Sequence, residues 1–259
     1  MRMAAQKSMP VLFIGHGSPM NAIEENEFSA EWKKIAGKFP KPRGIICISA
    51  HWVTEGTGAT AMASPRTIHD FYGFPPELYD AEYRAPGSPS LALRVKSLVK
   101  SADVGMDSEW GLDHGAWSVL KNMYPQADVP VVQLSLNANL GMEGHVRIGR
   151  ELAPLRKEGV LVLGSGNVVH NLMEMRLDGE PFGYAVEFDA FVKGRLEARD
   201  ELALAGYMEN RNAPRALPTN EHYLPLLYAL GASEGEKPRF FCEKIFQSSL
   251  SMRCVAYGL

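Results

Sequence analysis

The stretch VLFIGHGSP, residues 11–19, decides the fold. It opens with the apolar run 11–14, passes through Gly15 and places an imidazole directly after it, at His16. A short, continuous apolar run that ends in glycine is typical of a strand buried on both faces of a parallel sheet. The residue after such a strand lies at the carboxyl edge of the sheet, where open α/β proteins bind their ligands.

Three further apolar runs repeat this pattern, at residues 45–49, 129–136 and 160–163. Amphipathic stretches with apolar residues at helical spacing lie between and after them, and the last spans 188–196. This alternation predicts an α/β fold: one domain, residues 1–259, with a central, mostly parallel sheet flanked by helices. We expect residues 239–246 and 249–257 to form closing strands that can run antiparallel.

Composition and charge narrow the function class. The chain has 259 residues, of which 46% are hydrophobic, and a formal net charge of −3. These values exclude a disordered chain, and no basic excess points to nucleic acid or to an anionic membrane. Three cysteines without a CxxC spacing argue against a disulfide framework. The apolar run 11–14 is too short for a signal peptide or a membrane span, so we expect a cytoplasmic protein.

Five histidines are placed where chemistry is expected. His16, His51 and His170 each follow an apolar run, so three strands deliver an imidazole to one edge of the sheet. His114 lies in the loop GLDHGAW, and His222 lies in PTNEHYLP, near a helix start. Imidazole is the commonest metal ligand and an acid/base near neutral pH. Their convergence predicts a mononuclear zinc or non-haem iron site at the strand carboxyl edge.

Other polar residues carry weaker signals. We expect His69 to be a hydrogen-bonding loop residue and His145 to be solvated on the polar face of a helix. Glu221 could complete a two-histidine, one-carboxylate metal site, although a solvent-facing glutamate in a first helical turn is the more common case. Gly164 and Gly166 would let the backbone approach the site closely.

Residues 64–89 contain five prolines and many aromatic side chains. A long loop of this kind inside a compact domain is usually functional, often as a wall or lid. Phe71, Tyr72 and Phe74 are candidate walls for a flat ligand, or pins that hold the loop in place. Arg84 and Lys121 are candidate anchors for a charged substrate group, with ordinary surface charges as the alternative.

Taken together, the motifs have a family resemblance. The set GHGSPMN, SAHW, HDFYGFPPELYDAEYRAPG, LDHGAW, GSGNVVHNL and NEHYLPLLYALGA resembles the class III extradiol ring-cleaving dioxygenases. The subgroup it is most similar to is the 4,5-DOPA dioxygenases of plants and bacteria. The resemblance runs from about Val11 to the C-terminus, and the combination of motifs is far more specific than any one of them.

The resemblance implies roles for the five histidines. His16, His51 and His222 would be metal ligands. His170 would be the acid/base residue and also lies in a position to bind the metal, and an ordinary imidazole pKa of about 6.5 suits that work. His114 would be a second catalytic residue that contacts the substrate hydroxyls. The implied cofactor is one Fe(II) ion per chain, or Zn(II) in protein as isolated.

The implied reaction is oxygen-dependent cleavage of a catechol ring such as that of DOPA, with both atoms of O2 entering the product. Tyr72, Phe74 and His114 would contact this small aromatic diol. Three alternatives stay open: a zinc hydrolase using the same site, a tetrapyrrole metal chelatase with a similar HGS motif, and a non-catalytic metal-binding protein. The sequence does not identify the catechol, the ring bond that is cleaved or the number of subunits.

Overall fold

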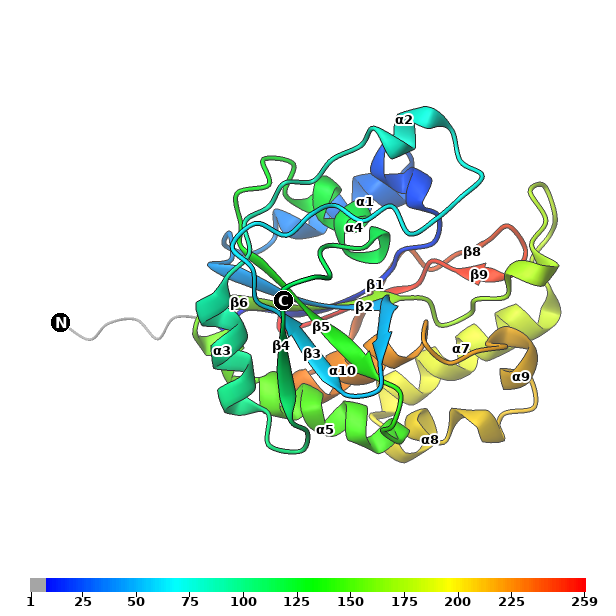
Figure 1. The fold of residues 1–259 in the computed structure, drawn as a ribbon. Coiled ribbons are helices and arrows are strands. Elements are labelled where there is room, and N and C mark those ends of the chain that lie inside the picture. The colour runs from blue at the N-terminus through cyan, green and yellow to red at the C-terminus, as the bar shows by residue number, and fades with distance from the viewer. Residues whose placement is uncertain (1–7) are drawn as a thin grey trace.

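The computed structural model describes residues 8–259 and is built around an eight-stranded sheet (Figure 1). The strand order is β4-β3-β5-β2-β6-β1-β10-β7. Neighbours pair in parallel at β1–β6, β2–β5, β2–β6 and β3–β4, and antiparallel at β1–β10, β10–β7 and β3–β5. The predicted α/β class with a mostly parallel sheet is therefore confirmed. Residues 1–7 of the predicted domain lie outside the described part of the chain.

The strands are short, and the longest is the central strand β2. Their bounds are β1 Val11–Gly15, β2 Gly44–Thr54, β3 Thr57–Thr60, β4 Val104–Asp107, β5 Val131–Asn137, β6 Val160–Gly166, β7 Arg239–Phe241 and β10 Cys254–Tyr257, with a separate hairpin of β8 Ile245–Phe246 and β9 Leu250–Ser251. The tail thus closes the sheet with the antiparallel strands β7 and β10, as expected.

Helices cover both faces of the sheet. Their bounds are α1 Glu27–Ala36, α2 Pro76–Tyr79, α3 Pro89–Leu98, α4 His114–Met123, α5 Met142–Leu152, α6 Pro154–Lys157, α7 Gly183–Ala198, α8 Glu201–Ala205, α9 Ala213–Ala216 and α10 Leu224–Ala232, with 3-10 turns at η1 Pro19–Ala22, η2 Leu172–Glu174 and η3 Tyr207–Glu209. Among the described residues, no helix is long and apolar enough to cross a membrane.

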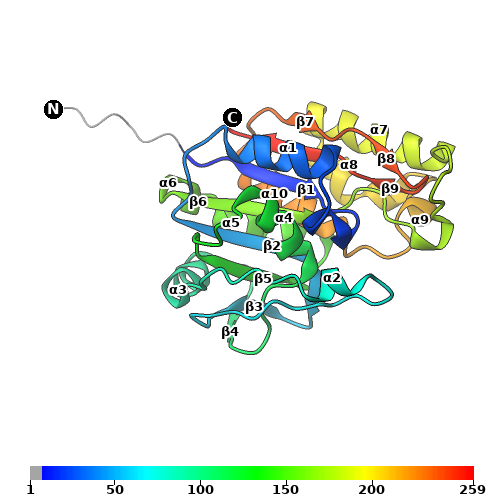
Figure 2. The same cartoon turned by 90° about the horizontal axis from the view of Figure 1, so that it is seen from above.

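The two faces of the sheet are separate apolar cores. Side chains alternate along a strand, so Val11 and Phe13 of β1 pack into one cluster while Leu12 and Ile14 pack into the other. Figures 1 and 2 show α1 and α4 on one face and α5, α7 and α10 on the other. This sandwich explains why the strands read as unbroken apolar runs, and it leaves the strand ends free to carry polar side chains.

Two strand boundaries differ from the sequence prediction. Strand β5 begins at Val131 and not at residue 129, because Pro130 has no backbone N–H to donate to a ladder. Strand β2 continues to Thr54, past the predicted end at residue 49. Its pairing with β5 shifts register between Ile48 and Val53, which is the mark of a bulge. His51 therefore lies inside the irregular part of a strand, where a bulge re-aims its side chain.

The prediction for His145 was wrong. This residue lies in α5 and is only 1% exposed. Helix α10 packs against α5, and the Tyr228 hydroxyl lies 3.1 Å from Nδ1 of His145. The helical periodicity of α5 shows which of its faces is apolar, but it cannot show that a helix some 80 residues away covers the other face as well.

Candidate active site

Five imidazoles converge beyond the carboxyl ends of β1, β2 and β6. His16 follows β1, His51 lies in the bulged end of β2, and His170 lies in the loop after β6. His114 is the first residue of α4, and His222 lies two residues before α10. The structure thus brings together all five histidines that the sequence analysis singled out.

Three of these imidazoles form a nearly equilateral triangle. The ring centroids of His16, His51 and His222 are 5.0, 5.0 and 5.1 Å apart, and one nitrogen from each lies within 4.8 Å of the other two. Nε2 of His16 is 3.1 Å from Nε2 of His51. Two ligands of a tetrahedral zinc site with bonds of about 2.0–2.1 Å lie about 3.3 Å apart. The spacing is therefore that of ligands to one ion.

Ser165 sets the tautomer of His16. Its hydroxyl donates its single proton to the carbonyl oxygen of Gly115 at 2.5 Å, so it accepts from Nδ1 of His16 at 2.9 Å. Nδ1 of His16 therefore carries the proton, and Nε2 presents a free lone pair to the centre of the triangle. A partner of this kind orients a metal-binding histidine. Sequence reasoning missed Ser165, although it lies in the quoted GSG segment.

The Asp70 carboxylate faces two other imidazoles. Its Oδ1 accepts the backbone N–H of His114 at 2.8 Å, and its Oδ2 lies 3.0 Å from Nδ1 of His114 and 3.6 Å from Nδ1 of His51. Burial on its own would raise the pKa of Asp70, but hydrogen bonds from His114 and the charges of His114 and His51 lower it overall. The carboxylate is therefore ionised at neutral pH. Sequence reasoning missed Asp70; the available signal was its place in the quoted HDFYG motif.

Asp113 holds the element that carries His114. It caps α4 by accepting the backbone N–H of Ala116, and it also accepts from the Ser49 hydroxyl at 2.6 Å and from Nε2 of Gln133 at 2.7 Å. These bonds tie α4 to β2 and β5 beneath the site. Burial raises the pKa of this carboxyl. The position of His114 is thus set by both strands.

His222 shows a missing partner. Its Nδ1 is buried, and no polar atom of residues 8–259 hydrogen-bonds to it. Buried polar atoms in proteins almost always have a binding partner. When no protein atom is that partner, a bound metal ion is one candidate. The His222 backbone reaches the sheet because position 166 is glycine: a Cβ there would lie 2.1 Å from the His222 carbonyl oxygen. The predicted close approach at Gly166 is confirmed.

Burial keeps the imidazoles neutral. It lowers the pKa of His16, His51 and His222 well below 6.5, and the neighbouring imidazoles add to the effect. Metal ions bind neutral imidazole, so these side chains are in the binding-competent form at neutral pH. Burial, and then His114, lower the pKa of His170 to about 4. The ordinary value of 6.5 assumed from sequence does not hold, and His170 is an unprotonated base at pH 7.

The donor set therefore fits a divalent metal ion: three neutral imidazoles lie at ligand spacing, His16 has a fixed tautomer, and Nδ1 of His222 has no partner among residues 8–259. Glu221 is not part of it. Its carboxylate accepts a hydrogen bond from Thr219 at 2.7 Å and belongs to neither of the histidine clusters able to hold a metal. The solvent-facing alternative for Glu221 is the one the structure favours.

A cavity of about 520 Å³ opens over the histidines. Phe71, Tyr72 and Phe74 line it, so the 64–89 loop forms one wall as predicted. The ring of Phe71 meets His114 edge-on, with centroids 5.7 Å apart and planes at 80°. His170 stacks on His222, with centroids 3.4 Å apart and planes at 8°. The cavity thus combines aromatic walls with a histidine floor.

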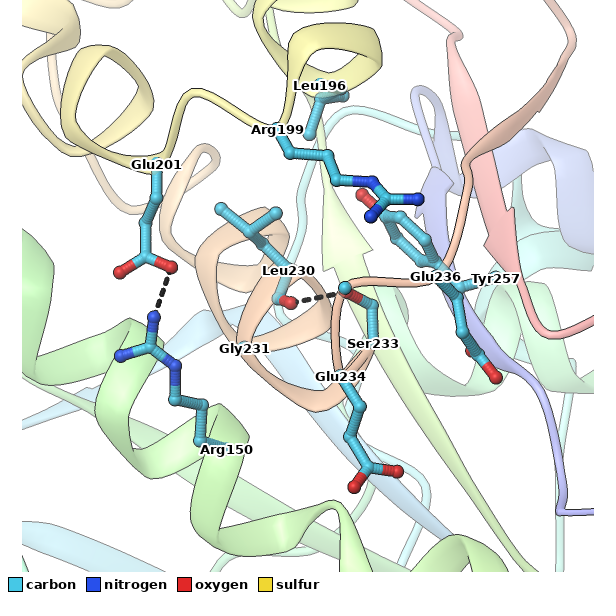
Figure 3. Close-up of a pocket in the computed structure, with 11 residues that line it drawn as sticks. Arg150, Leu196, Arg199, Glu201, Leu230, Gly231, Ser233, Glu234, Glu236 and Tyr257 are labelled. Carbon is cyan, nitrogen blue, oxygen red and sulfur yellow. Dashed lines mark hydrogen bonds and ion pairs between the residues drawn. The ribbon is translucent and has the colours of Figure 1, made fainter.

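A second cavity, of about 410 Å³, lies at the end of the sheet near Tyr257 (Figure 3). The Arg150–Glu201 ion pair and the Ser233 hydroxyl, which donates to the Leu230 carbonyl, line it. Among the described residues that line this cavity there is no histidine or cysteine, and none belongs to either histidine cluster able to hold a metal. It is therefore not the catalytic cavity.

The remaining candidates are structural. Nε2 of His69 lies 2.9 Å from the carbonyl oxygen of Ala81, which confirms a loop hydrogen bond. Arg84 pairs with Glu82 on the surface, and Lys121 donates to the Glu82 carbonyl at 3.2 Å. Neither cation lines the histidine cavity. The surface-charge alternative for both cations is therefore correct.

The family is decided by a match along nearly the whole chain. The family described as the catalytic LigB subunit of aromatic ring-opening dioxygenase matches residues 10–255, a range that includes all five histidines. The chain belongs to this family. The resemblance inferred from the motifs is therefore confirmed. The family that the chain matches is one of dioxygenases, and not one of hydrolases or chelatases.

Individual relatives agree with this assignment. The chain is 47% identical over 257 residues to the 4,5-DOPA dioxygenase extradiol of Escherichia coli (strain K12), covering 96% of this chain and 95% of that protein. It is 40% identical to the 4,5-DOPA dioxygenase extradiol of Beta vulgaris, covering 95% and 93%. A solved structure of an uncharacterized protein from Escherichia coli K12 matches with a TM-score of 0.85 at 43% identity, covering 96% and 99%. This LigB-family chain is an extradiol ring-opening dioxygenase of the DOPA dioxygenase type.

Proposed function

We propose that this dioxygenase cleaves the ring of a catechol with O2, at a single Fe(II) ion held by His16, His51 and His222. DOPA is the substrate named for its relatives and is the first catechol to test. The observation that carries the proposal is the triangle of imidazoles at ligand spacing at the floor of an aromatic cavity. Bound Fe(II) would supply the redox chemistry with O2 that no side chain of the cavity offers.

The chain's own residues would prepare the substrate. His170 faces the cavity beside His222 and is neutral at pH 7, so it can accept the proton of a catechol hydroxyl. His114 lies in the same cavity, and Asp70 binds its backbone N–H and faces its ring. We assign His114 to the second hydroxyl. Phe71 stands edge-on to His114, and Phe71, Tyr72 and Phe74 enclose the flat ring.

Charge balance favours this substrate. Three neutral imidazoles leave a divalent ion with its full double charge, and an anionic catecholate offsets that charge. The same three-histidine set is also a good zinc site, and zinc has no redox chemistry. We therefore expect protein isolated with zinc to bind a catechol without cleaving it, and we keep a cytoplasmic location as part of the proposal.

Oxygen uptake tests the proposal directly. Metal-free protein is reloaded anaerobically with Fe(II) and mixed with DOPA or a simple catechol, and uptake is recorded with product absorbance. One O2 consumed per catechol, with a coloured ring-opened product, is the expected result. Iron confirmed in the site but no uptake with any catechol would overturn the proposal. The zinc-loaded protein, which should consume no O2, is the matched control.

A further inference from the structure

The cavity over the histidines has a small set of polar side chains besides the five imidazoles. They are Ser18, Asp70, Tyr72 and Gln247. Asp70 already faces two of the imidazoles, and Tyr72 is 91% exposed, so water already solvates it. Of the described residues that line the cavity, none is a lysine or an arginine. Ser18 and Gln247 are therefore the neutral hydrogen-bonding groups that a substrate can meet within the cavity.

Gln247 is held at the cavity by backbone hydrogen bonds. It lies in the turn between β8 and β9, where Gln247 and Ser248 adopt φ angles of 46° and 67°, a conformation that favours glycine. The Gln247 carbonyl accepts from the backbone N–H of Arg176 at 3.0 Å, and the Ser248 carbonyl accepts from that of Phe182 at 3.0 Å. These bonds dock the turn on the segment that follows His170. A backbone outlier held in this way beside a cavity points to a role for its side chain.

Ser18 approaches the same part of the cavity from another segment. Phe246, next to Gln247, meets Phe28 of α1 edge-on, with ring centroids 5.7 Å apart. The β8–β9 hairpin therefore packs on the start of α1, and the η1 turn that Ser18 caps comes just before this helix in the chain. The hairpin turn thus connects the segment after His170 with the segment after β1.

Ser18 and Gln247 both have unused hydrogen-bonding capacity. Ser18 Oγ accepts from the backbone N–H of Met20 at 3.2 Å, and its own proton has no acceptor among residues 8–259. The side-chain amide of Gln247 makes no hydrogen bond within the same part of the chain, although its backbone carbonyl does. A primary amide offers two N–H donors and a carbonyl acceptor, and a hydroxyl offers one donor. Together these groups can donate to a carboxylate and accept from an ammonium group.

We propose that Gln247 and Ser18 are specificity-determining residues that bind the amino acid end of a catechol amino acid such as DOPA. Gln247 Nε2 and Ser18 Oγ donate to the substrate carboxylate, and Gln247 Oε1 accepts from its ammonium group. This inference rests on the proposed function, because it places the diol on the histidine floor and the amino acid end toward the β8–β9 turn. An engineered cavity of about 150 Å³ already holds a benzene ring. A cavity of about 520 Å³ therefore has room for both parts of the substrate.

The physical reason is the charge of the substrate's amino acid end. At neutral pH this end is a zwitterion with no net charge, so it needs hydrogen-bond donors and acceptors but no opposing cation. Hydrogen bonds to its two ionised groups are of the stronger, charge-assisted kind. A ligand with only the carboxylate, or only the ammonium group, brings a net charge that a neutral amide and a hydroxyl leave unpaired. We therefore expect the cavity to prefer the zwitterion to either singly charged relative.

A matched ligand series tests the proposal by binding. 3-(3,4-Dihydroxyphenyl)propanoate is L-DOPA without the amine, and dopamine is L-DOPA without the carboxylate. Isothermal titration uses the zinc-loaded protein, so that no ligand is consumed. We expect L-DOPA to bind at least about fivefold more tightly than either relative, because each relative loses hydrogen bonds to a charged group. Equal or tighter binding of the propanoate or of dopamine would overturn the proposal.

Variants of Gln247 locate the preference. Gln247→Met keeps the length of the side chain and removes its polar atoms, so the preference for L-DOPA over both relatives should fall at least about threefold. Gln247→Glu should shift the preference toward dopamine and Gln247→Lys toward the propanoate, because each places a charge of known sign at the anchor. Gln126→Met is the matched control, because Gln126 is exposed and does not line the cavity. An unchanged preference in all three Gln247 variants, or an equal change in the control, contradicts the assignment.

Ser18 gives an independent test. Ser18→Ala removes the hydroxyl and also the acceptor that caps η1, whereas Ser18→Thr keeps both. We expect the preference for L-DOPA to fall in Ser18→Ala and to be restored in Ser18→Thr, with circular dichroism and zinc content equal to wild type in each. A preference that both variants retain would remove Ser18 from the anchor.

Oxygen uptake by the Fe(II) protein separates failure of this inference from failure of the proposed function. Uptake with L-DOPA, its two relatives and 4-methylcatechol at equal kcat/KM would support ring cleavage and overturn the anchor. Selective binding of L-DOPA that depends on Gln247, without uptake of O2, would contradict ring cleavage and still support the anchor.

Discussion

The histidine cluster and His145 are both buried imidazole environments, yet only one is a site. Burial lowers the pKa of His145 to about 4, the same direction and value as for His170. His145, however, has Tyr228 as a partner within the core, whereas Nδ1 of His222 has none among the described residues. Burial and a lowered pKa do not by themselves identify a metal centre. Convergence of several imidazoles at the spacing of ligands to one ion does.

The largest expected effect follows from removing one corner of the triangle. His16→Ala takes away the nitrogen that Ser165 orients toward the centre. Changing a residue that only orients a metal ligand costs about 10- to 100-fold in metal affinity, so losing the ligand itself should cost more than about 100-fold. Equilibrium dialysis against Fe(II) or Zn(II) with elemental analysis measures it. His145→Gln, a change at the other buried histidine, should bind metal as wild type does, and equal loss in both variants would break the comparison.

The second effect separates catalysis from ligation. His170→Ala removes the proposed base but leaves the triangle intact. We expect full metal content, with kcat lower by about 10²- to 10⁴-fold. Metal analysis and oxygen uptake on the same sample decide this. A variant that lost its metal in parallel with its activity would make His170 a ligand instead.

A smaller effect is expected at the carboxylate that orients two of the rings. Asp70→Asn keeps the shape but removes the charge beside His114 and His51. We expect metal affinity or kcat to fall by about 10- to 100-fold. Asp80→Asn, at an exposed position of the same loop, is the control and should change neither quantity. If Asp70→Asn behaved like this control, Asp70 would have no orienting role.

The smallest effect concerns stability and involves His145. Its pKa is about 4 when folded and near 6.5 when unfolded, so below pH 6.5 the unfolded chain binds more protons. The stability due to neutral His145 is therefore complete above pH 6.5 and is lost as the pH falls toward 4. The loss is at most about 3 kcal/mol. Urea unfolding at pH 7.0 and 4.5 measures it.

His145→Gln keeps a polar partner for Tyr228 but does not titrate. Its stability should fall less between the two pH values than that of wild type, after zinc is removed from both. An equal fall would show that other groups, such as the site histidines, carry the whole acid sensitivity.

Much of the fold was predictable because strand burial and helix periodicity are local properties. The apolar runs at residues 11–14 and 160–163 each became a strand, and the tail closed the sheet. The strand ends of a parallel sheet share one edge, which is why His16, His51 and His170 could be expected to meet. The missed residues are far in sequence from the histidines that they contact. Ser165 is 149 positions from His16, and Tyr228 is 83 positions from His145. Asp70 is 44 positions from His114 and 19 from His51.

The sequence by itself determined the α/β class, the family resemblance and the set of five histidines, because each depends on residue types and their spacing. Only the tertiary structure decided which imidazole nitrogens face one another and which have partners among the described residues. These contacts depend on distances between segments that are far apart in the chain. A side-chain hydrogen bond is lost when the distance between donor and acceptor grows by a fraction of an ångström. Periodicity carries no information at that scale.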